Sequence, residues 1–291
     1  MSLPLHHFET VQFETVSQTG STNSDLLERP FEVLPQRPKA LIAWRQTAGR
    51  GRRGRVWQSD LADAPLRSLT FSMALERKAD AFQPLTALSL VMGICIAKAL
   101  QAIYPKEAAA LKVKWPNDLV MRLSNGSLGK VGGILIETKR MSDVQRIVIG
   151  VGLNLFTPDE PAVSDVPDAS DASDMPNAQG VSAYRAHSLI KAVDETTQTR
   201  MAQLHAVAQQ LCVAMITSWR RFEQEGWPAF RDDWAALDAL LGQPVLVIES
   251  DTNQWSAHHL GLDDQGQLRV MTEAGERRVL VGDVSLRSIK N

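Results

Sequence analysis

The sequence predicts an α+β protein in which a domain built on a mixed β-sheet is followed by a small β-barrel. Up to residue 241, short runs of strand-forming residues alternate with longer segments whose apolar residues have helical spacing. From Gly242 onward only short β runs remain, separated by turn signals at 263–266 and 273–275. These two observations predict one domain over residues 1–241 and a second over residues 242–291.

The same patterns place the individual elements. In the first domain we expect strands at 40–44, 68–75, 111–115, 134–137 and 147–151, and helices at 84–103, 201–225 and 227–241. In the second domain we expect strands at 245–249, 255–260, 268–271 and 278–281. The helices are expected to cover one face of the sheet. Segment 157–180 is rich in Asp, Pro, Ser and Ala, which predicts a solvated loop inserted in the first domain.

Composition narrows the function classes. The formal net charge of -2 and the pI near 6.3 argue against a protein that coats nucleic acid with a basic surface. Cys95 and Cys212 lie in apolar, helix-like stretches, so we expect buried, reduced thiols. The longest apolar run, 85–100, includes Lys98 and favours a buried helix over a membrane span. Without a secretory signal pattern at the start of the sequence, a cytoplasmic protein is expected.

The strongest candidate for a ligand site is the segment AGRGRRGR at 48–55, which follows a predicted strand. Its three glycines allow the backbone to fold closely around a ligand, and its four arginines offer forked donors to phosphate or carboxylate oxygens. Taken alone, this segment is also compatible with a solvated surface loop or with an Arg/Gly contact to nucleic acid.

Four weaker motifs accompany it. Segment 112–118, KVKWPND, ends a predicted strand with an amide and a carboxylate, although a simple Pro-Asn-Asp turn explains it as well. Lys130 precedes the pair Gly132-Gly133, which allows close backbone approach to a ligand. Residues 21–23, Ser-Thr-Asn, are typical of a helix N-terminus, where capping is the simpler interpretation. Asn154 ends the strand-like run IGVGLN, as a turn-forming asparagine also would.

Taken together, these segments resemble those of the bacterial biotin protein ligases. The resemblance rests on STNSDLL, QTAGRGRRGRVW, KVKWPNDL, GKVGGILIE and IGVGLNL, with further similarity in FEQEGWPAFRDDW and GDVSLRS. It runs from about residue 15 to the end, apart from the loop at 157–180. It implies a catalytic domain of the biotin/lipoate ligase type, a C-terminal domain like a Src-homology-3 barrel, and action on biotin, ATP with magnesium, and a biotin carboxyl carrier protein.

The resemblance also assigns residues. Those expected around biotin are Ser21, Thr22, Gln46, Gly49, Arg50, Arg52 and Lys130. Those expected at ATP or the adenylate are Arg52, Arg55, Trp57, Lys114, Asn117, Asn154 and Arg287. Lys130, Arg52 and Asp118 would take part in catalysis, with Lys130 serving both biotin and the α-phosphate, and no metal ligands are assigned.

The implied reaction forms biotinyl-5′-AMP and then transfers biotin to a lysine of the carrier protein of acetyl-CoA carboxylase or of a related enzyme. Bifunctional members of the family carry an N-terminal DNA-binding domain, which the short segment before Ser21 cannot contain. Neither DNA nor a membrane is therefore an expected partner, while a homodimer is left open.

Three other functions share some of these sequence features. A lipoate or octanoate protein ligase has similar chemistry and fold, but the GRGRRGR and KWPND segments favour biotin. A nucleic-acid-binding protein is disfavoured by the acidic pI and by the lack of an aromatic stacking platform. A P-loop ATPase is disfavoured because the glycine expected five residues before Gly129 is missing and Val131 replaces the magnesium-binding Ser or Thr.

Overall fold

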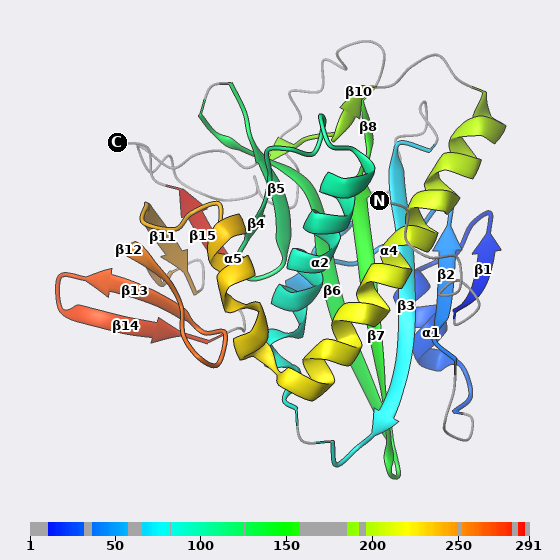
Figure 1. Cartoon of the computed structure of the whole chain (residues 1–291), viewed down its shortest axis with the longest axis horizontal. Coiled ribbons are helices and arrows are strands. Elements are labelled where there is room, and N and C mark those ends of the chain that lie inside the picture. The colour runs from blue at the N-terminus through cyan, green and yellow to red at the C-terminus, as the bar shows by residue number, and fades with distance from the viewer. Residues whose placement is uncertain are drawn as a thin grey trace. The chain divides into compact units, whose positions relative to one another are not determined.

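The computed structural model in Figure 1 describes residues 11–31, 37–57, 66–81, 83–124, 126–157, 185–191, 196–249, 252–280 and 285–288. The chain divides into two compact units. The first comprises residues 1–83, 132–161 and 188–219, and the second comprises residues 84–131, 162–187 and 220–291. The division into domains at residue 241 stays a prediction.

The first unit is built on a mixed β-sheet, which confirms the expected sheet type. Its strands are β1 (Gln12–Val16), β2 (Lys39–Ala43), β3 (Ser68–Lys78), β7 (Val144–Asn154) and the part of β6 (Leu128–Met141) from Gly132 onward, in the order β1-β2-β3-β7-β6. β1 and β2 are parallel, whereas β2–β3, β3–β7 and β7–β6 are antiparallel. A short parallel pair joins β8 (Phe156–Thr157) to β10 (Ile190–Lys191).

Helices lie on both faces of this sheet, so the expectation that they cover a single face is wrong. α1 (Thr22–Glu28) packs its Leu26 against Ala74 and Val148. The long helix α4 (Thr197–Glu225) lies on the opposite face, where Trp219 packs against the guanidinium of Arg77. The physical reason is that residues 68–75 of β3 are buried without alternation, so both faces of the strand need cover (Figure 1).

The second unit contains η3 (Leu85–Ala87), α2 (Leu88–Ile103), β4 (Leu111–Lys114), β5 (Asp118–Arg122), η4 (Trp227–Phe230) and α5 (Arg231–Leu237). β4 and β5 form an antiparallel hairpin, and β9 (Arg185–Ala186) pairs with residues 129–130 of β6. Helix 85–103 is long and apolar enough to cross a membrane by length and composition, but most of α2 is buried within the protein. It is therefore the core helix that the sequence predicts. Cys95 in this helix and Cys212 in α4 of the first unit are both buried, as expected.

The same unit ends in a five-stranded antiparallel sheet, as expected for the small C-terminal β domain. Its strands are β11 (Pro244–Ile248), β12 (Gln254–Leu262), β13 (Leu268–Thr272), β14 (Gly275–Val279) and β15 (Ser285–Ser288), in the order β14-β13-β12-β11-β15. β14 begins three residues before the predicted run, because Gly275 adopts a positive φ of 112° that closes a tight turn after Thr272.

Other boundaries also differ from the predictions. The predicted strand 134–137 is only the centre of β6, and the predicted helix 227–241 ends at Leu237. β1, β5 and β15 were not predicted. Thr157, placed at the start of the predicted loop 157–180, belongs to β8, and the rest of that loop lies outside the described residues.

Candidate functional site

The N-terminus of α1 brings three predicted biotin residues together, Ser21, Thr22 and Gln46. Ser21 is the N-cap residue, but its side chain makes no capping hydrogen bond, so the simpler interpretation of this motif as a cap is wrong. Instead Gln46 accepts a hydrogen bond at Oε1 from the backbone N–H of Thr22, at 2.8 Å. A side chain from the loop after β2 thus does the work of a cap. Ser21 and Thr22 are both buried.

A chain of buried polar side chains continues from Thr22. Its hydroxyl lies 2.6 Å from that of Ser72, whose hydroxyl donates to Oδ1 of Asn23 at 2.6 Å. The amide of Asn23 then donates to Oε2 of Glu137 at 2.7 Å. Each hydroxyl has one proton, so Ser72, having donated to Asn23, accepts from Thr22. All donors in this chain therefore point toward Glu137.

Three members of this chain were missed by the sequence analysis. Asn23 and Glu137 lay inside the quoted motifs without an assigned role, and Ser72 lay outside them. The signal that could have found Ser72 and Glu137 is a polar residue within an otherwise apolar strand. Gly150 has a related role, because a Cβ at this position would overlap the side chain of Asn23.

The Gly/Arg segment folds as a tight loop. Gly51 N–H donates to the carbonyl of Arg55 at 2.7 Å, and η2 (Arg52–Gly54) lies between them, with Arg53 at a positive φ of 61°. Arg50 forms an ion pair with Glu137 at 3.2 Å. The loop is therefore joined through Glu137 to the same polar chain that begins at Thr22.

Trp57 closes the loop against β7. The backbone N–H of Trp57 donates to the carbonyl of Gly49 at 2.9 Å. A Cβ on Gly49 would come within 2.6 Å of the carbonyl oxygen of Trp57. The indole ring lies on Gly152, where a Cβ would overlap the ring. Asn154, at the end of β7, accepts a hydrogen bond from Ser68 at 3.3 Å. Both glycines are thus required by the packing of a predicted nucleotide residue.

In the second unit, Asp118 holds two of the predicted lysines. Its carboxylate lies 2.9 Å from Nζ of Lys114 and 3.1 Å from Nζ of Lys130. The side chains of Lys114 and Asp118 are only 7% and 11% exposed, and that of Lys130 is 24% exposed. Burial raises the pKa of Asp118, but the charges and hydrogen bonds of the two lysines outweigh it and hold the pKa well below its usual range. Asp118 is therefore ionised at neutral pH.

Residues 115–117 form the turn of the β4–β5 hairpin. Lys114 pairs with Asp118 across the hairpin, so the turn consists of Trp115, Pro116 and Asn117, and not of the Pro-Asn-Asp of the alternative interpretation. Trp115 is fully buried, and the carbonyl of Pro116 accepts a hydrogen bond from Ser89 of α2 at 3.1 Å. This packing fixes the residue after the turn, Asp118, at the start of β5.

Two further predictions concern Arg287 and the metal. Arg287 lies in β15, paired with Leu246, and its side chain is outside the described residues. Within the part of the chain that the structure describes, no three His, Cys, Asp or Glu side chains form a group that could hold a metal ion. Magnesium commonly keeps several waters and binds through one or two carboxylates and substrate phosphates.

Comparisons with known proteins agree with the fold. Residues 16–154 match the biotin/lipoate A/B protein ligase family, and residues 240–287 match the biotin protein ligase C-terminal domain. The chain is 31% identical over 271 residues to the bifunctional ligase/repressor BirA of Escherichia coli (strain K12), covering 92% of this chain and 72% of that protein. It is 30% identical over 275 residues to the biotin--[acetyl-CoA-carboxylase] ligase of Mycobacterium tuberculosis, covering 94% and 88%.

A solved structure shows the same fold. The biotin protein ligase from Aquifex aeolicus, in complex with biotin and ATP, superposes with a TM-score of 0.68 at 24% identity, covering 95% of this chain and 99% of that one. The fold and the matched regions define a protein of the biotin/lipoate ligase class. The chain belongs to the biotin protein ligases, which confirms the resemblance found in the sequence.

Proposed function

We propose that the protein joins biotin to ATP, releasing pyrophosphate, and then transfers the biotinyl group of biotinyl-5′-AMP to a lysine of a biotin carboxyl carrier protein. The relatives named above support this reaction. Within the chain, the observation that carries it is the pair of lysines held on Asp118, because cations in a partly buried place are what an attack of carboxylate on phosphate needs.

The polar N-terminus of α1 suits the binding of biotin. Ser21 offers a hydroxyl that is not used as a cap, and Thr22 and Gln46 are fixed by their mutual hydrogen bond. Arg50 lies on the loop that Glu137 holds to the sheet. We assign Ser21, Thr22, Gln46, Gly49, Arg50 and Arg52 to biotin, and Arg52, Arg55, Trp57, Asn154 and Arg287 to the nucleotide.

Lys130 and Lys114 supply positive charge for adenylation. The biotin carboxylate and the α-phosphate are both anionic, and a fixed cation stabilises the charge that develops on the phosphate oxygens as the carboxylate oxygen bonds to phosphorus and pyrophosphate leaves. Lys130 is the more exposed of the two lysines, so we assign it to biotin and the α-phosphate. Lys114 and Asn117 are assigned to the nucleotide, whose phosphates would hold the magnesium ion.

Asp118 acts by orientation. A carboxylate whose pKa is held well below its usual range is a weak base, so it is poorly suited to take a proton from the incoming lysine amine. We assign it the task of holding Lys114 and Lys130 in place. In the second step the amine attacks the anhydride carbonyl, an amide bond forms, the amine loses its proton and AMP leaves.

The test is direct. Purified protein is incubated with biotin, magnesium, ATP and a biotin carboxyl carrier domain, and the mass of the domain is measured. The expected result is the addition of one biotinyl group that depends on ATP, with pyrophosphate released even when the carrier is omitted. Parallel reactions with lipoate or octanoate cover the alternative acyl groups. Labelling with lipoate and none with biotin would overturn the assignment.

The partners follow from this function. We propose as acceptor the carrier protein of acetyl-CoA carboxylase or of a related biotin-dependent enzyme, and a cytoplasmic location, where such acceptors are made. A matched acceptor in which the target lysine is replaced by arginine should stay unlabelled.

A further inference from the structure

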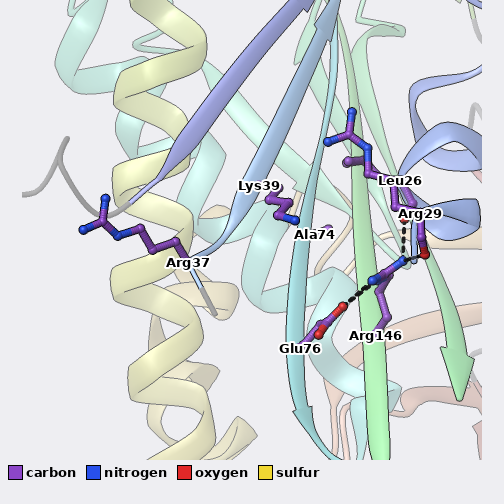
Figure 2. A pocket seen from close by; sticks show the side chains of 7 residues that line it. All are labelled: Leu26, Arg29, Arg37, Lys39, Ala74, Glu76 and Arg146. Atoms are coloured by element: carbon purple, nitrogen blue, oxygen red, sulfur yellow. Dashed lines mark hydrogen bonds and ion pairs between the residues drawn. The ribbon is translucent and has the colours of Figure 1, made fainter. Parts of the chain in front are cut away.

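Arg146 lies at the C-terminal end of α1 and binds one carbonyl of its last turn and two carbonyls just after it. The residue is only 3% exposed. Its guanidinium donates to the backbone oxygens of Leu26 at 3.1 Å, Arg29 at 2.5 Å and Pro30 at 2.8 Å. Figure 2 shows it between Glu76 and the end of the helix. The ring of Phe31 lies 4.2 Å from its guanidinium carbon. Of these partners only Leu26 belongs to a sequence motif, STNSDLL.

A second residue fixes Arg146 itself. Glu76 accepts from Nε of Arg146 at 2.8 Å, and the two residues are direct cross-strand partners on β3 and β7. Both side chains are about 95% buried. A buried guanidinium held by a carboxylate has one fixed geometry, so its remaining donors can specify the position of whatever they bind.

The two ends of α1 are anchored to the same pair of strands. Ser72, four residues before Glu76 on β3, binds the N-terminal end of the helix through Asn23, and it pairs with Gly150 just as Glu76 pairs with Arg146. Four residues of strand span roughly 13 Å, and a helix of seven residues is roughly 10 Å long. The anchors are thus spaced to match the length of the helix.

A helix of this size needs such anchors. Seven residues are too few for a helix to be stable on its own in water, and Ser21 contributes no side-chain cap. Hydrogen bonds to the C-terminal carbonyls, made by a cation, satisfy groups that a helix leaves open and complement its dipole. Loss of Arg146 would leave the C-terminal end of α1 held by the packing of Leu26 and by the more exposed ion pairs of Glu28 with Lys139 and of Arg29 with Glu14.

We infer that Arg146, oriented by Glu76, is a positioning residue for biotin binding. It touches no substrate, and it acts by holding α1 so that Ser21 and Thr22 at the other end keep their places. This inference rests on the proposed assignment of those two residues to biotin.

The choice of variant decides whether the test is informative. Arg146→Met alone would leave the carboxylate of Glu76 buried without its partner and could unfold the protein. The double variant Glu76→Met/Arg146→Met removes both charges at similar volume, a replacement that proteins often tolerate, yet the carbonyls of α1 lose their donors. Arg77→Met is the matched control, because Arg77 also lies on β3 and donates to a backbone carbonyl, that of Gln83, on the opposite face of the sheet.

The readouts separate positioning from stability. In the double variant we expect the KM for biotin to rise by about tenfold, the scale of one or two lost hydrogen bonds. The KM for ATP and the kcat at saturating biotin should stay within about twofold of the wild type. Amide hydrogen exchange of residues 21–29 should become faster. Arg77→Met should change none of these.

Several results would overturn the inference. One is a folded double variant with an unchanged KM for biotin. Another is an equal rise in the KM for ATP, which would indicate general loosening. If the double variant does not fold, Arg146→Lys keeps the charge beside Glu76 with fewer donors and should show a smaller rise in the KM for biotin only. Failure of the wild type to form biotinyl-AMP would sink the proposed function instead, and faster exchange in α1 would still show the anchor.

Discussion

Removing the charge of Asp118 should strongly destabilise the protein. In Asp118→Asn the ammonium of Lys114, 7% exposed, loses the carboxylate 2.9 Å away and stays close to a second cation. At an effective dielectric constant of about 20, each contact of this length corresponds to roughly 5 kcal/mol of Coulomb energy. Breaking a buried pair by removing one partner costs about 3–5 kcal/mol. We expect a loss in this range, mostly from Lys114, because Lys130 can turn toward solvent.

Urea denaturation and thermal melting of the wild type and the variant measure this loss. For a chain of this size each kcal/mol lowers Tm by about 2–4 °C, so Tm should fall by roughly 6–20 °C. The pKa of Asp118 is lowered in the folded state. Its contribution is therefore complete above the unfolded pKa of about 3.9 and is lost as pH falls toward the folded pKa. The difference between wild type and variant should be constant from about pH 6 to 8 and shrink below about pH 4.

A matched double variant checks the cause. Lys114→Gln/Asp118→Asn removes the stranded ammonium together with its partner, so it should recover much of the lost stability. The reasoning fails if Asp118→Asn lies within about 1 kcal/mol of the wild type, or if the difference between them grows as the solution is acidified.

Three further changes have defined outcomes. Ser21→Ala should alter the free energy of unfolding by less than about 0.5 kcal/mol, because the hydroxyl caps nothing, while raising the KM for biotin; a loss of about 1 kcal/mol, usual for an N-cap, would contradict this. Gly150→Ala should displace Asn23 and cost about 1–3 kcal/mol in urea titrations, whereas Gly20→Ala, with open space around it and no positive φ, should stay within about 0.5 kcal/mol of the wild type. Lys130→Ala should lower adenylation by about a hundredfold or more, which pyrophosphate release would report; an unaltered rate would refute its role.

The sequence patterns predicted those helices and strands whose apolar residues are visible within a short stretch of the chain. The apolar runs of β3 and β7 and the spacing within α2 and α4 mark these elements by themselves. In β1 every residue is exposed or only partly buried, so no apolar run marks the strand. Its place beside β2 depends on a parallel pairing that no turn specifies. Its position therefore could not be found from a single sequence.

The residues of the candidate site fall into two groups, those that stand in recognisable motifs and those whose partners are distant in the sequence. Gly49, Lys114, Asp118 and Lys130 stand in motifs whose glycines and charges are visible in the sequence. Ser72 and Arg146 have roles set by partners 49 and 120 residues away, at Asn23 and Leu26. Since such pairings come from tertiary packing, the sequence alone marks Arg146 only as an arginine in an apolar strand.

The one-way order of protons from Thr22 through Ser72 and Asn23 to Glu137 limits what a ligand can offer at its starting point. The single hydroxyl hydrogen of Thr22 has two acceptors within reach, the hydroxyl of Ser72 at 2.6 Å and Oε1 of Gln46 at 3.2 Å, so its oxygen presents lone pairs to an incoming molecule. A compound that brings an N–H there extends the polarised chain by one link and gains from its cooperativity, whereas a carbonyl at the same spot meets electron density and is repelled. We expect this corner of the protein to discriminate between molecules by the direction of their dipole as well as by their shape.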